Sequence, residues 1–323
     1  MNEQLTAAAK LAEQLICETK KVILGAEETL RLLVTALLAD GHVLLEDLPG
    51  TGKTTLVKGI AAAAGLQMRR VQGTPDLMPQ DITGFDMLDI APDGRRTTVF
   101  REGPVFTQVL LADEINRMAP RTQAGLLECM AERQITSGGK CYPLPKPFFV
   151  IATQNPIEMQ GTFPLPEAQL DRFLMRLSVG QPDPATEREI LLGRQLADPL
   201  ESVSAVTDAD AVLAAQQAVR TVTVSPEVLD YITALMTAAR SHKKLRYGLS
   251  TRAALALMRT AQSYAAVSGR DYVLPDDVKA VFPAVCTHRL HLSGMLLTEQ
   301  NAAEQITAEL LAQTPVGKGT AGS

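Results

Sequence analysis

The spacing of apolar residues near the start of the chain is that of two helices. It predicts helices over residues 3–20 and 27–39, with a break near Gly25. Short apolar runs then take over, each too brief for a helix and bounded by polar or turn-forming residues. They predict five strands, with helices over 54–64 and 121–133 between them. The predicted strands are Val43–Leu45, Met68–Val71, Val109–Ala112, Phe148–Ala152 and Phe173–Val179.

Two segments between the strands, and everything after residue 180, depart from this alternation. Residues 75–106 are rich in Pro, Gly and Asp, which predicts turns and short hairpins, and 134–147 is a Gly- and Pro-rich excursion. From Gly180 onward the pattern becomes helical, and Thr186 is a candidate N-cap. The predicted helices there cover 186–196, 207–219, 225–240, 250–268 and 275–282.

This order of elements predicts an α/β fold with a parallel five-stranded sheet flanked by helices, followed by an all-α domain. We expect a core with an N-terminal helical flank over 1–180 and a helical domain over 181–312. The glycine-containing segment 313–323 predicts a disordered tail.

Composition narrows the class of protein. The chain has 323 residues, 46% of them hydrophobic, and a formal net charge of -5, which argues against a general polyanion binder. Aromatic residues make up only 4%, so few platforms exist for stacking nucleic-acid bases. The four cysteines form no C-x-x-C pair, and the polar start contains no apolar signal core. We therefore expect a cytoplasmic protein without a membrane span.

The stretch VLLEDLPGTGKTTLV, from Val43 to Val57, has the shape of a phosphate-binding loop. Gly52, Lys53 and Thr54 fit the pattern Gly, four residues, Gly-Lys-Ser/Thr, but Asp47 stands at the first glycine position. A side chain at this position can point away from the phosphates, so phosphate binding does not require a glycine there. The expected nucleotide-binding residues are Asp47, Leu48, Pro49, Gly50, Thr51, Gly52, Lys53, Thr54 and Thr55.

Polar residues follow two of the later apolar strands. In VLLADEINR, Asp113 is expected to hold Mg²⁺ together with Thr54, and Glu114 to polarise the attacking water. Paired acids that merely cap a strand end are the alternative. In FFVIATQNP, Asn155 is expected to hydrogen-bond the γ-phosphate or its water, and an ordinary Asn-Pro turn is the alternative.

These segments together resemble the AAA+ ATPases, and within them the MoxR family. The resemblance runs through LLEDLPGTGKT, TPDLMPQDITG, REGPVF, LLADEINRMAPRTQAGLLECMAERQIT and VIATQNPIEMQGTFPLPEAQLDRFLMRL to GLSTRAALAL. It implies an ATPase with ATP and Mg²⁺ as cofactors. The glycines, Lys53 and Thr54 would form Walker A, Asp113 and Glu114 Walker B, and Asn155 sensor 1. The helical domain would be the AAA+ lid.

The resemblance also gives two arginines a role. Arg172, in LDRF, would be an arginine finger that reaches a neighbouring subunit's γ-phosphate, and Arg252, in LSTRAAL, would be sensor 2. Whether Arg252 acts on its own nucleotide or a neighbour's stays open. The simpler alternatives are an ion pair of Arg172 with Asp171 and a solvated Arg252. Residues 83–104 match the hairpin insert of this clade, and 134–147 its pre-sensor hairpin.

At the level of function, the resemblance implies a chaperone-like ATPase that assembles as a hexameric ring. It would remodel or mature protein complexes, including cofactor or metal insertion, with a von Willebrand A domain protein as partner on a separate chain. Two other classes remain alternatives. One is a nucleotide-gated scaffold with little turnover, and the other is a nucleic-acid motor of a related clade.

Two further clusters are weaker candidates. Cys286, His288 and His291 lie close in sequence, but a metal site needs three or four converging ligands. The basic run Arg240–Arg246 is more typical of a solvated or inter-subunit face than of a polyanion site.

Overall fold

The computed structural model describes residues 2–90, 92, 96–156, 161–195, 198–294 and 301–316. At its centre lies a five-stranded sheet in the order β2-β5-β8-β1-β9. The strands are β2 (Met68–Gln72), β5 (Val109–Asp113), β8 (Phe149–Gln154), β1 (Val43–Glu46) and β9 (Met175–Leu177). Every neighbouring pair is parallel. The predicted parallel five-stranded sheet is confirmed.

Helices cover both faces of the sheet, which explains why the three inner strands β5, β8 and β1 consist mainly of buried apolar residues. On β5, Val109 and Leu111 pack into one buried cluster, and Leu110 and Ala112 pack into the other. The first cluster includes α1 (Glu3–Lys20), α2 (Glu27–Leu38) and α3 (Lys53–Ala63), and the second includes α5 (Pro120–Glu132).

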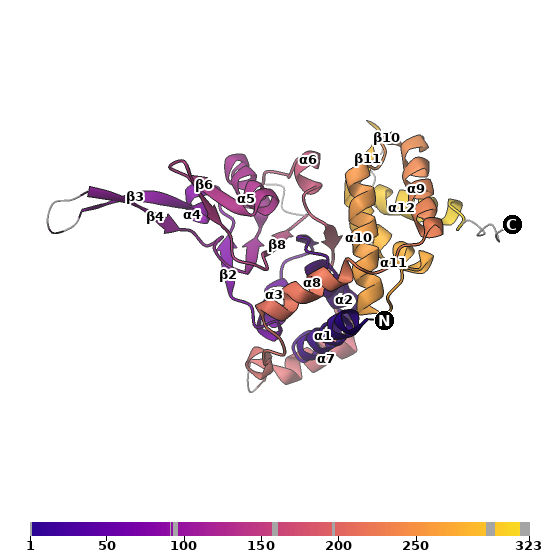
Figure 1. Cartoon of the computed structure of the whole chain (residues 1–323), viewed down its shortest axis with the longest axis horizontal. Coiled ribbons are helices and arrows are strands. Elements are labelled where there is room, and N and C mark those ends of the chain that lie inside the picture. Colours follow the sequence, from indigo (N-terminus) through magenta and orange to yellow (C-terminus); the bar gives the residue numbers. More distant parts are fainter. Residues whose placement is uncertain are drawn as a thin grey trace.

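Two hairpins extend the core. β3 (Gly84–Ile90) pairs antiparallel with β4 (Arg96–Glu102) and projects from the body (Figure 1). A second hairpin consists of β6 (Gln134–Ser137) and β7 (Lys140–Pro143). The Phe100 ring stacks on Tyr142 with ring centroids 4.2 Å apart, and Ser137 Oγ donates to Asp86 Oδ2 at 2.7 Å. The two hairpins therefore contact each other directly.

After β9 the chain is mainly helical. The helices are α7 (Pro184–Gly193), α8 (Ala209–Val219), α9 (Pro226–Ser241), α10 (Thr251–Val267), α11 (Pro275–Cys286) and α12 (Ala302–Gln313). This part also contains a short antiparallel pair, β10 (Leu245–Tyr247) and β11 (His291–Leu292). Shorter helices of the core are α4 (Pro79–Thr83) and α6 (Glu167–Leu170).

The helix α7 begins earlier than predicted, so the choice of Thr186 as its N-cap was wrong. The Asp183 carboxylate accepts the backbone N–H groups of Ala185 and Thr186, both at 2.9 Å. Pro184 occupies the first helical position, where a missing N–H costs nothing. The helix α12 was not predicted, and its last residue, Gln313, was assigned to the tail. Residue 196, at the end of the predicted helix 186–196, and residues 317–323 of the predicted tail lie outside the described part.

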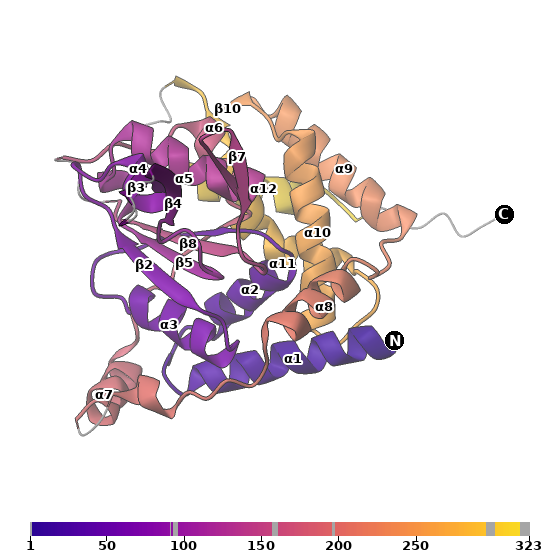
Figure 2. The same cartoon turned by 60° about the vertical axis from the view of Figure 1, so that its left-hand side comes forward.

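The N-terminal helices pack against the later helices as well as against the sheet. Figure 2 shows α8 lying alongside α1, and α10 packs on α2. Buried polar contacts join α8 and α10 to α2, since Gln216 Nε2 donates to Leu37 O and Ser263 Oγ to Thr35 O, both at 2.8 Å. Among the described residues, none of the helices combines the length and apolar character that a membrane crossing requires.

Candidate nucleotide-binding site

The loop that joins β1 to α3 depends on two glycines for its backbone conformation. Gly50 has φ +84° and Gly52 has φ +82°, both in the left-handed region. A Cβ at either position would meet no atom within 4 Å. The glycines are therefore required by their φ angles and not by crowding.

A cavity of about 320 Å³ opens beside this loop. It is lined by Pro49, Gly50, Thr51, Gly52, Lys53, Thr54, Thr55, Asp113, Glu114, Thr153, Gln154 and Asn155. These residues come from three segments that the sequence analysis singled out separately. They meet because β1, β8 and β5 are adjacent parallel strands, so their carboxyl ends lie at one edge of the sheet.

The ammonium group of Lys53 is folded back onto the loop. Its Nζ donates to the backbone carbonyls of Asp47 at 2.9 Å and of Leu48 at 2.6 Å. Burial lowers the pKa of Lys53, and the charges of Asp47, Asp113 and Glu114 partly oppose this effect. Phosphate oxygens entering the cavity would compete with the two carbonyls for this donor.

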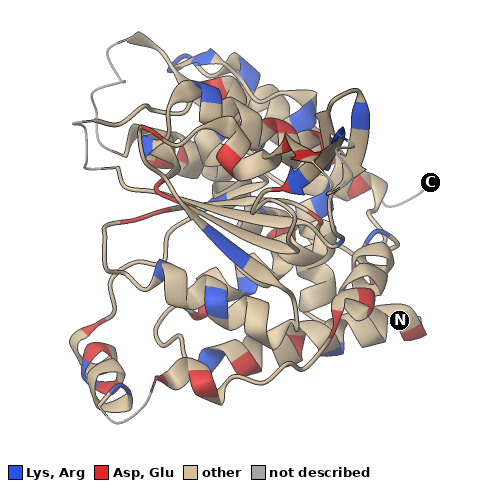
Figure 3. Cartoon of the chain, turned by 90° about the vertical axis from the view of Figure 1, so that its left-hand side faces the viewer, with Lys and Arg blue, Asp and Glu red and all other residues tan. Residues whose placement is uncertain are grey.

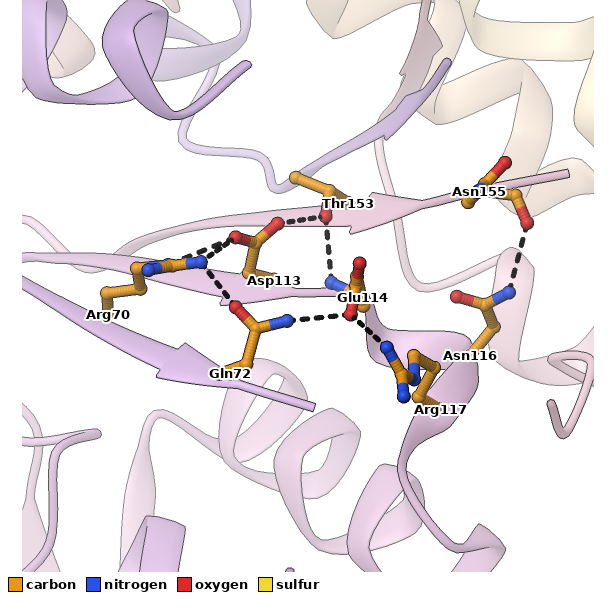
Figure 4. Close-up of polar contacts among 8 residues, drawn as sticks. All are labelled: Arg70, Gln72, Asp113, Glu114, Asn116, Arg117, Thr153 and Asn155. Atoms are coloured by element: carbon orange, nitrogen blue, oxygen red, sulfur yellow. Dashed lines mark hydrogen bonds and ion pairs between the residues drawn. The ribbon is translucent and has the colours of Figure 1, made fainter. Parts of the chain in front are cut away.

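The Asp113 carboxylate is engaged on both oxygens (Figure 4). Oδ1 accepts from Thr153 Oγ at 2.6 Å, and Oδ2 accepts from Arg70 Nε at 3.0 Å and Nη2 at 2.6 Å. Thr54 and Asp113 line the same cavity and offer hydroxyl and carboxylate oxygens, which are ligands that Mg²⁺ prefers. Their chemistry therefore fits Mg²⁺.

The Glu114 carboxylate is restrained by two donors. Its Oε2 accepts from Gln72 Nε2 at 2.7 Å and from Arg117 Nη1 at 3.1 Å, as Figure 4 shows. Its backbone has φ +55°, and its N–H donates to the Thr153 hydroxyl at 2.8 Å. Gln72 also accepts from Arg70, so one network joins both carboxylates.

Sequence reasoning missed these supporting residues. Arg70 and Gln72 lie at the end of β2, which neighbours β5 in the sheet. The sequence contained one indication of them: Arg70 and Gln72 flank Val71 at the end of a predicted strand. Strand order, which shows that this end lies beside Asp113, is not visible in the sequence.

Asn155 is buried at the end of β8 and lines the cavity. Its backbone carbonyl accepts from Asn116 Nδ2 at 3.1 Å. The predicted site residues from Pro49 to Thr55, together with Asp113, Glu114 and Asn155, are therefore brought together.

The two predicted arginines lie at the opposite edge of the sheet. The Leu174 N–H donates to His42 O at 2.7 Å, so the segment with Arg172 lies beside the start of β1, whereas the phosphate loop follows its end. Arg172 Nη1 donates to Leu127 O at 2.6 Å. Arg252 Nη1 lies 3.6 Å from Asp171 Oδ2. The structure brings neither arginine to the cavity of its own chain.

Asp171 forms its closest ion pair with another arginine. Arg289, which is buried, places Nε 2.7 Å from Asp171 Oδ1 and also donates to Phe173 O at 2.7 Å. The suggested ion pair of Arg172 with Asp171 is therefore not formed in the described part of the chain. Asp171 pairs with Arg289 and Arg252 instead.

Among the described residues, the remaining candidates do not gather into a metal site, and the basic run is partly ion-paired. Cys286 and His288 are buried, and burial raises the pKa of Cys286 to about 12, whereas His291 Nδ1 lies 3.0 Å from Glu167 Oε2. No group of three or more metal-ligating side chains occurs within the described ranges. In the basic run, Lys244 pairs with Glu309 of α12 at 2.8 Å, which offsets part of its charge.

Comparison with known proteins agrees with this geometry. Residues 42–175 match the model of the ATPase family associated with various cellular activities (AAA), and 237–310 match the AAA lid domain. Chaperone MoxR1 of Mycobacterium tuberculosis is 40% identical over 96% of this chain and 82% of its own length. The Bacillus subtilis protein YeaC is 40% identical over 92% of each chain.

Two further proteins are similar over most of this chain. Protein MoxR of Methylorubrum extorquens is 33% identical over 85% of this chain and 86% of its own. The solved structure of a protein from Cytophaga hutchinsonii superimposes with a TM-score of 0.88 at 35% identity, covering 98% of both chains. The fold, the loop and these matches define an AAA+ ATPase. Within that class, the chain belongs to the MoxR family.

Proposed function

We propose that this chain binds ATP with Mg²⁺ in the cavity beside the phosphate loop and hydrolyses it. The convergence of Lys53, Asp113, Glu114 and Asn155 in one cavity carries this proposal. Thr54 and Asp113 would hold Mg²⁺, which when bound neutralises charge on the phosphates. Thr51 to Thr55 would surround the phosphates with backbone N–H groups at the start of α3.

In this scheme the other residues act on the attacking water and the γ-phosphate. Glu114 accepts a hydrogen bond from the water and orients it, and Asn155 donates to the γ-phosphate or to that water. Lys53 exchanges the carbonyls of Asp47 and Leu48 for phosphate oxygens. Arg70 and Thr153 position the Asp113 carboxylate, Gln72 restrains the Glu114 carboxylate, and none of the three would touch the nucleotide.

We further propose that Arg172 and Arg252 complete the site of a neighbouring subunit. Their place at the sheet edge opposite the loop supports action in trans, because a ring would present this edge of one copy to the cavity of the next. A hexameric ring in which the core, 1–180, and the lid, 181–312, rotate against each other would transmit nucleotide state to a partner.

What ATP hydrolysis drives in this protein is proposed from its membership of the MoxR family. One relative bears the name chaperone MoxR1. By analogy, this chain would remodel or mature protein complexes in the cytoplasm with a von Willebrand A domain partner. The nucleic-acid alternative gains no support from charge, since Figure 3 shows Lys and Arg segments interspersed with Asp and Glu on the side that carries the hairpins.

Substitution of Glu114 tests hydrolysis directly. Glu114→Gln keeps the shape of the side chain but loses the base, so we expect steady-state ATP hydrolysis to fall by about 10²-fold or more. Binding of ATP, measured by calorimetry, should persist. Glu128→Gln on the exposed face of α5 is the matched control and should behave as the wild type.

Unchanged turnover in Glu114→Gln would remove Glu114 from the reaction. A wild type that binds ATP in a nucleotide-dependent assembly but does not turn it over would favour the gated scaffold instead.

A further inference from the structure

The carboxylate of Asp47 faces away from the cavity and is buried, with only 8% of the residue exposed. Oδ1 accepts from Ser178 Oγ at 2.5 Å and from the Gly180 N–H at 3.3 Å. Oδ2 accepts from the Val179 N–H at 2.6 Å. A single side chain thus binds three consecutive residues of another segment.

The two segments that Asp47 joins are the exits from neighbouring strands. Asp47 is the first residue after β1, and Ser178 is the first residue after β9, which pairs with β1 in parallel. Beyond Gly180 the chain leaves the sheet for α7 and the lid helices. The contact therefore connects the start of the phosphate loop with the start of the connection to the lid.

The loop does not need aspartate for its own shape. Asp47 does not belong to the described non-glycine residues with positive φ, which are Asp40, Glu114, Arg133 and Asn301. An ordinary residue or the usual glycine would satisfy this backbone. Only a side chain with two acceptor oxygens makes all three contacts with 178–180.

The preceding residue extends the link to the end of the fold. Glu46 Oε2 lies 2.9 Å from Arg176 Nη1, and Arg176 Nη2 lies 2.8 Å from Glu304 of α12. Gln154, which lines the cavity, donates to Glu46 Oε1 at 3.3 Å. Consecutive residues at the loop entrance are thus tied to the connection that leads to the lid and to the last helix, α12.

The backbone of Asp47 is also in contact with Lys53 of the phosphate loop. Lys53 Nζ donates to the Asp47 carbonyl at 2.9 Å, and phosphates would draw this donor away. The hydrogen bond that phosphates would displace is therefore accepted by the same residue whose carboxylate binds residues 178–180.

We propose that Asp47 is a positioning residue that couples occupancy of the phosphate loop to the segment Ser178–Gly180, and through it to the lid. This inference rests on the proposed binding of ATP. It assigns Asp47 a role in transmission, whereas the nucleotide itself is held by the residues from Pro49 to Thr55.

Amide hydrogen exchange at Val179 and Gly180 tests the coupling. The full chain is measured alone and with saturating AMP-PNP and Mg²⁺, with saturation verified by calorimetry. In the wild type we expect the exchange rates of these two amides to change on nucleotide binding. In Asp47→Asn we expect exchange without nucleotide to be about 10-fold faster, because charge-assisted bonds are lost, and the nucleotide response to vanish.

Asp183→Asn is the matched control. It also loses a carboxylate that accepts two backbone N–H groups near the same segment, but Asp183 has no contact with the phosphate loop among the described residues. Its nucleotide response at Val179 and Gly180 should match the wild type. Equal loss of response in Asp183→Asn would overturn the specific role of Asp47.

Other outcomes separate the two proposals. A wild type that binds AMP-PNP without a change at Val179 and Gly180 overturns the coupling alone, whereas failure to bind AMP-PNP counts against the proposed function. An Asp47→Asn protein that folds but cannot bind AMP-PNP also overturns the coupling, because Asp47 would then be needed to form the loop. If Asp47→Asn does not fold, Ser178→Ala must reduce the response, and a full response there overturns the coupling.

Discussion

Gln72 holds one carboxylate oxygen of Glu114 at 2.7 Å, in competition with any water that this oxygen would orient. Arg117 donates to the same oxygen at 3.1 Å. A carboxylate with both donors in place is restrained, and hydrolysis requires it to face the γ-phosphate. At the residue scale, the support around Glu114 therefore acts on the rate of the reaction as well as on the shape of the site.

Removal of Gln72 should release this restraint. We expect Gln72→Ala to raise steady-state ATP turnover by roughly 2- to 10-fold, within the range of one hydrogen bond to a charged group. Gln217→Ala, on the exposed face of α8, is the control. A fall in turnover for Gln72→Ala at unchanged ATP affinity would show that Gln72 orients Glu114 productively.

The base of the hairpin β3–β4 is closed by two glycines. A Cβ on Gly103 would lie 2.2 Å from Ile82 O and 2.5 Å from Gly84 N, and one on Gly84 would lie 2.2 Å from Arg101 O. These neighbours are backbone atoms beside the fully buried Ile82, so they cannot move away by a change of side-chain rotamer. At the scale of elements, the absence of side chains at Gly84 and Gly103 lets the two chain segments approach closely where the hairpin joins the core.

Gly103→Ala should therefore destabilise the core. We expect a loss of about 1–3 kcal/mol in the free energy of unfolding, measured with urea, because the added methyl group overpacks a closed site. Gly193→Ala in α7 is the control, since its Cβ would meet no atom within 4 Å. Replacing glycine by alanine lowers the entropy of the unfolded chain, so Gly193→Ala should not be destabilising. A loss of equal size in both variants would show that the close approach at Gly103 does not set the effect.

Placement of Arg172 and Arg252 away from their own cavity has consequences for the whole molecule. If each site takes its loop from one subunit and Arg172 from the next, Glu114→Gln and Arg172→Ala damage opposite sides of an interface. Mixed rings then contain some interfaces in which both sides are intact.

Mixing the two variants should restore activity that neither has alone. In equal mixture we expect about one quarter of wild-type ATP turnover, because both intact groups meet at a quarter of random interfaces and a trans arginine is worth roughly 10³–10⁵ in rate. The double variant Glu114→Gln/Arg172→Ala mixed with either single variant should restore none. Mixed rings, verified by mass spectrometry, that stay inactive would exclude Arg172 from a shared site.

The sequence by itself determined the strands of the sheet, most of the helices and the local chemistry of the loop. Residues Val109–Ala112 form a buried strand because both faces of this segment are apolar, and Gly50 and Gly52 allow the positive φ angles of the loop. These are properties of neighbouring residues, so they can be read from a short stretch. Because strand ends of a parallel sheet meet at one edge, the grouping of Lys53, Asp113 and Asn155 could also be expected from the sequence.

Only the tertiary structure decided which distant side chains these residues contact. Asp47 binds Ser178–Gly180, Arg70 binds Asp113, and Arg252 lies beside Asp171. Each pair joins segments far apart in the chain, and its existence depends on strand order and on how the helices pack. A carboxylate has the same charge at any position, so its place in the sequence does not reveal which residue it binds. The fold determines that partner through distance and burial.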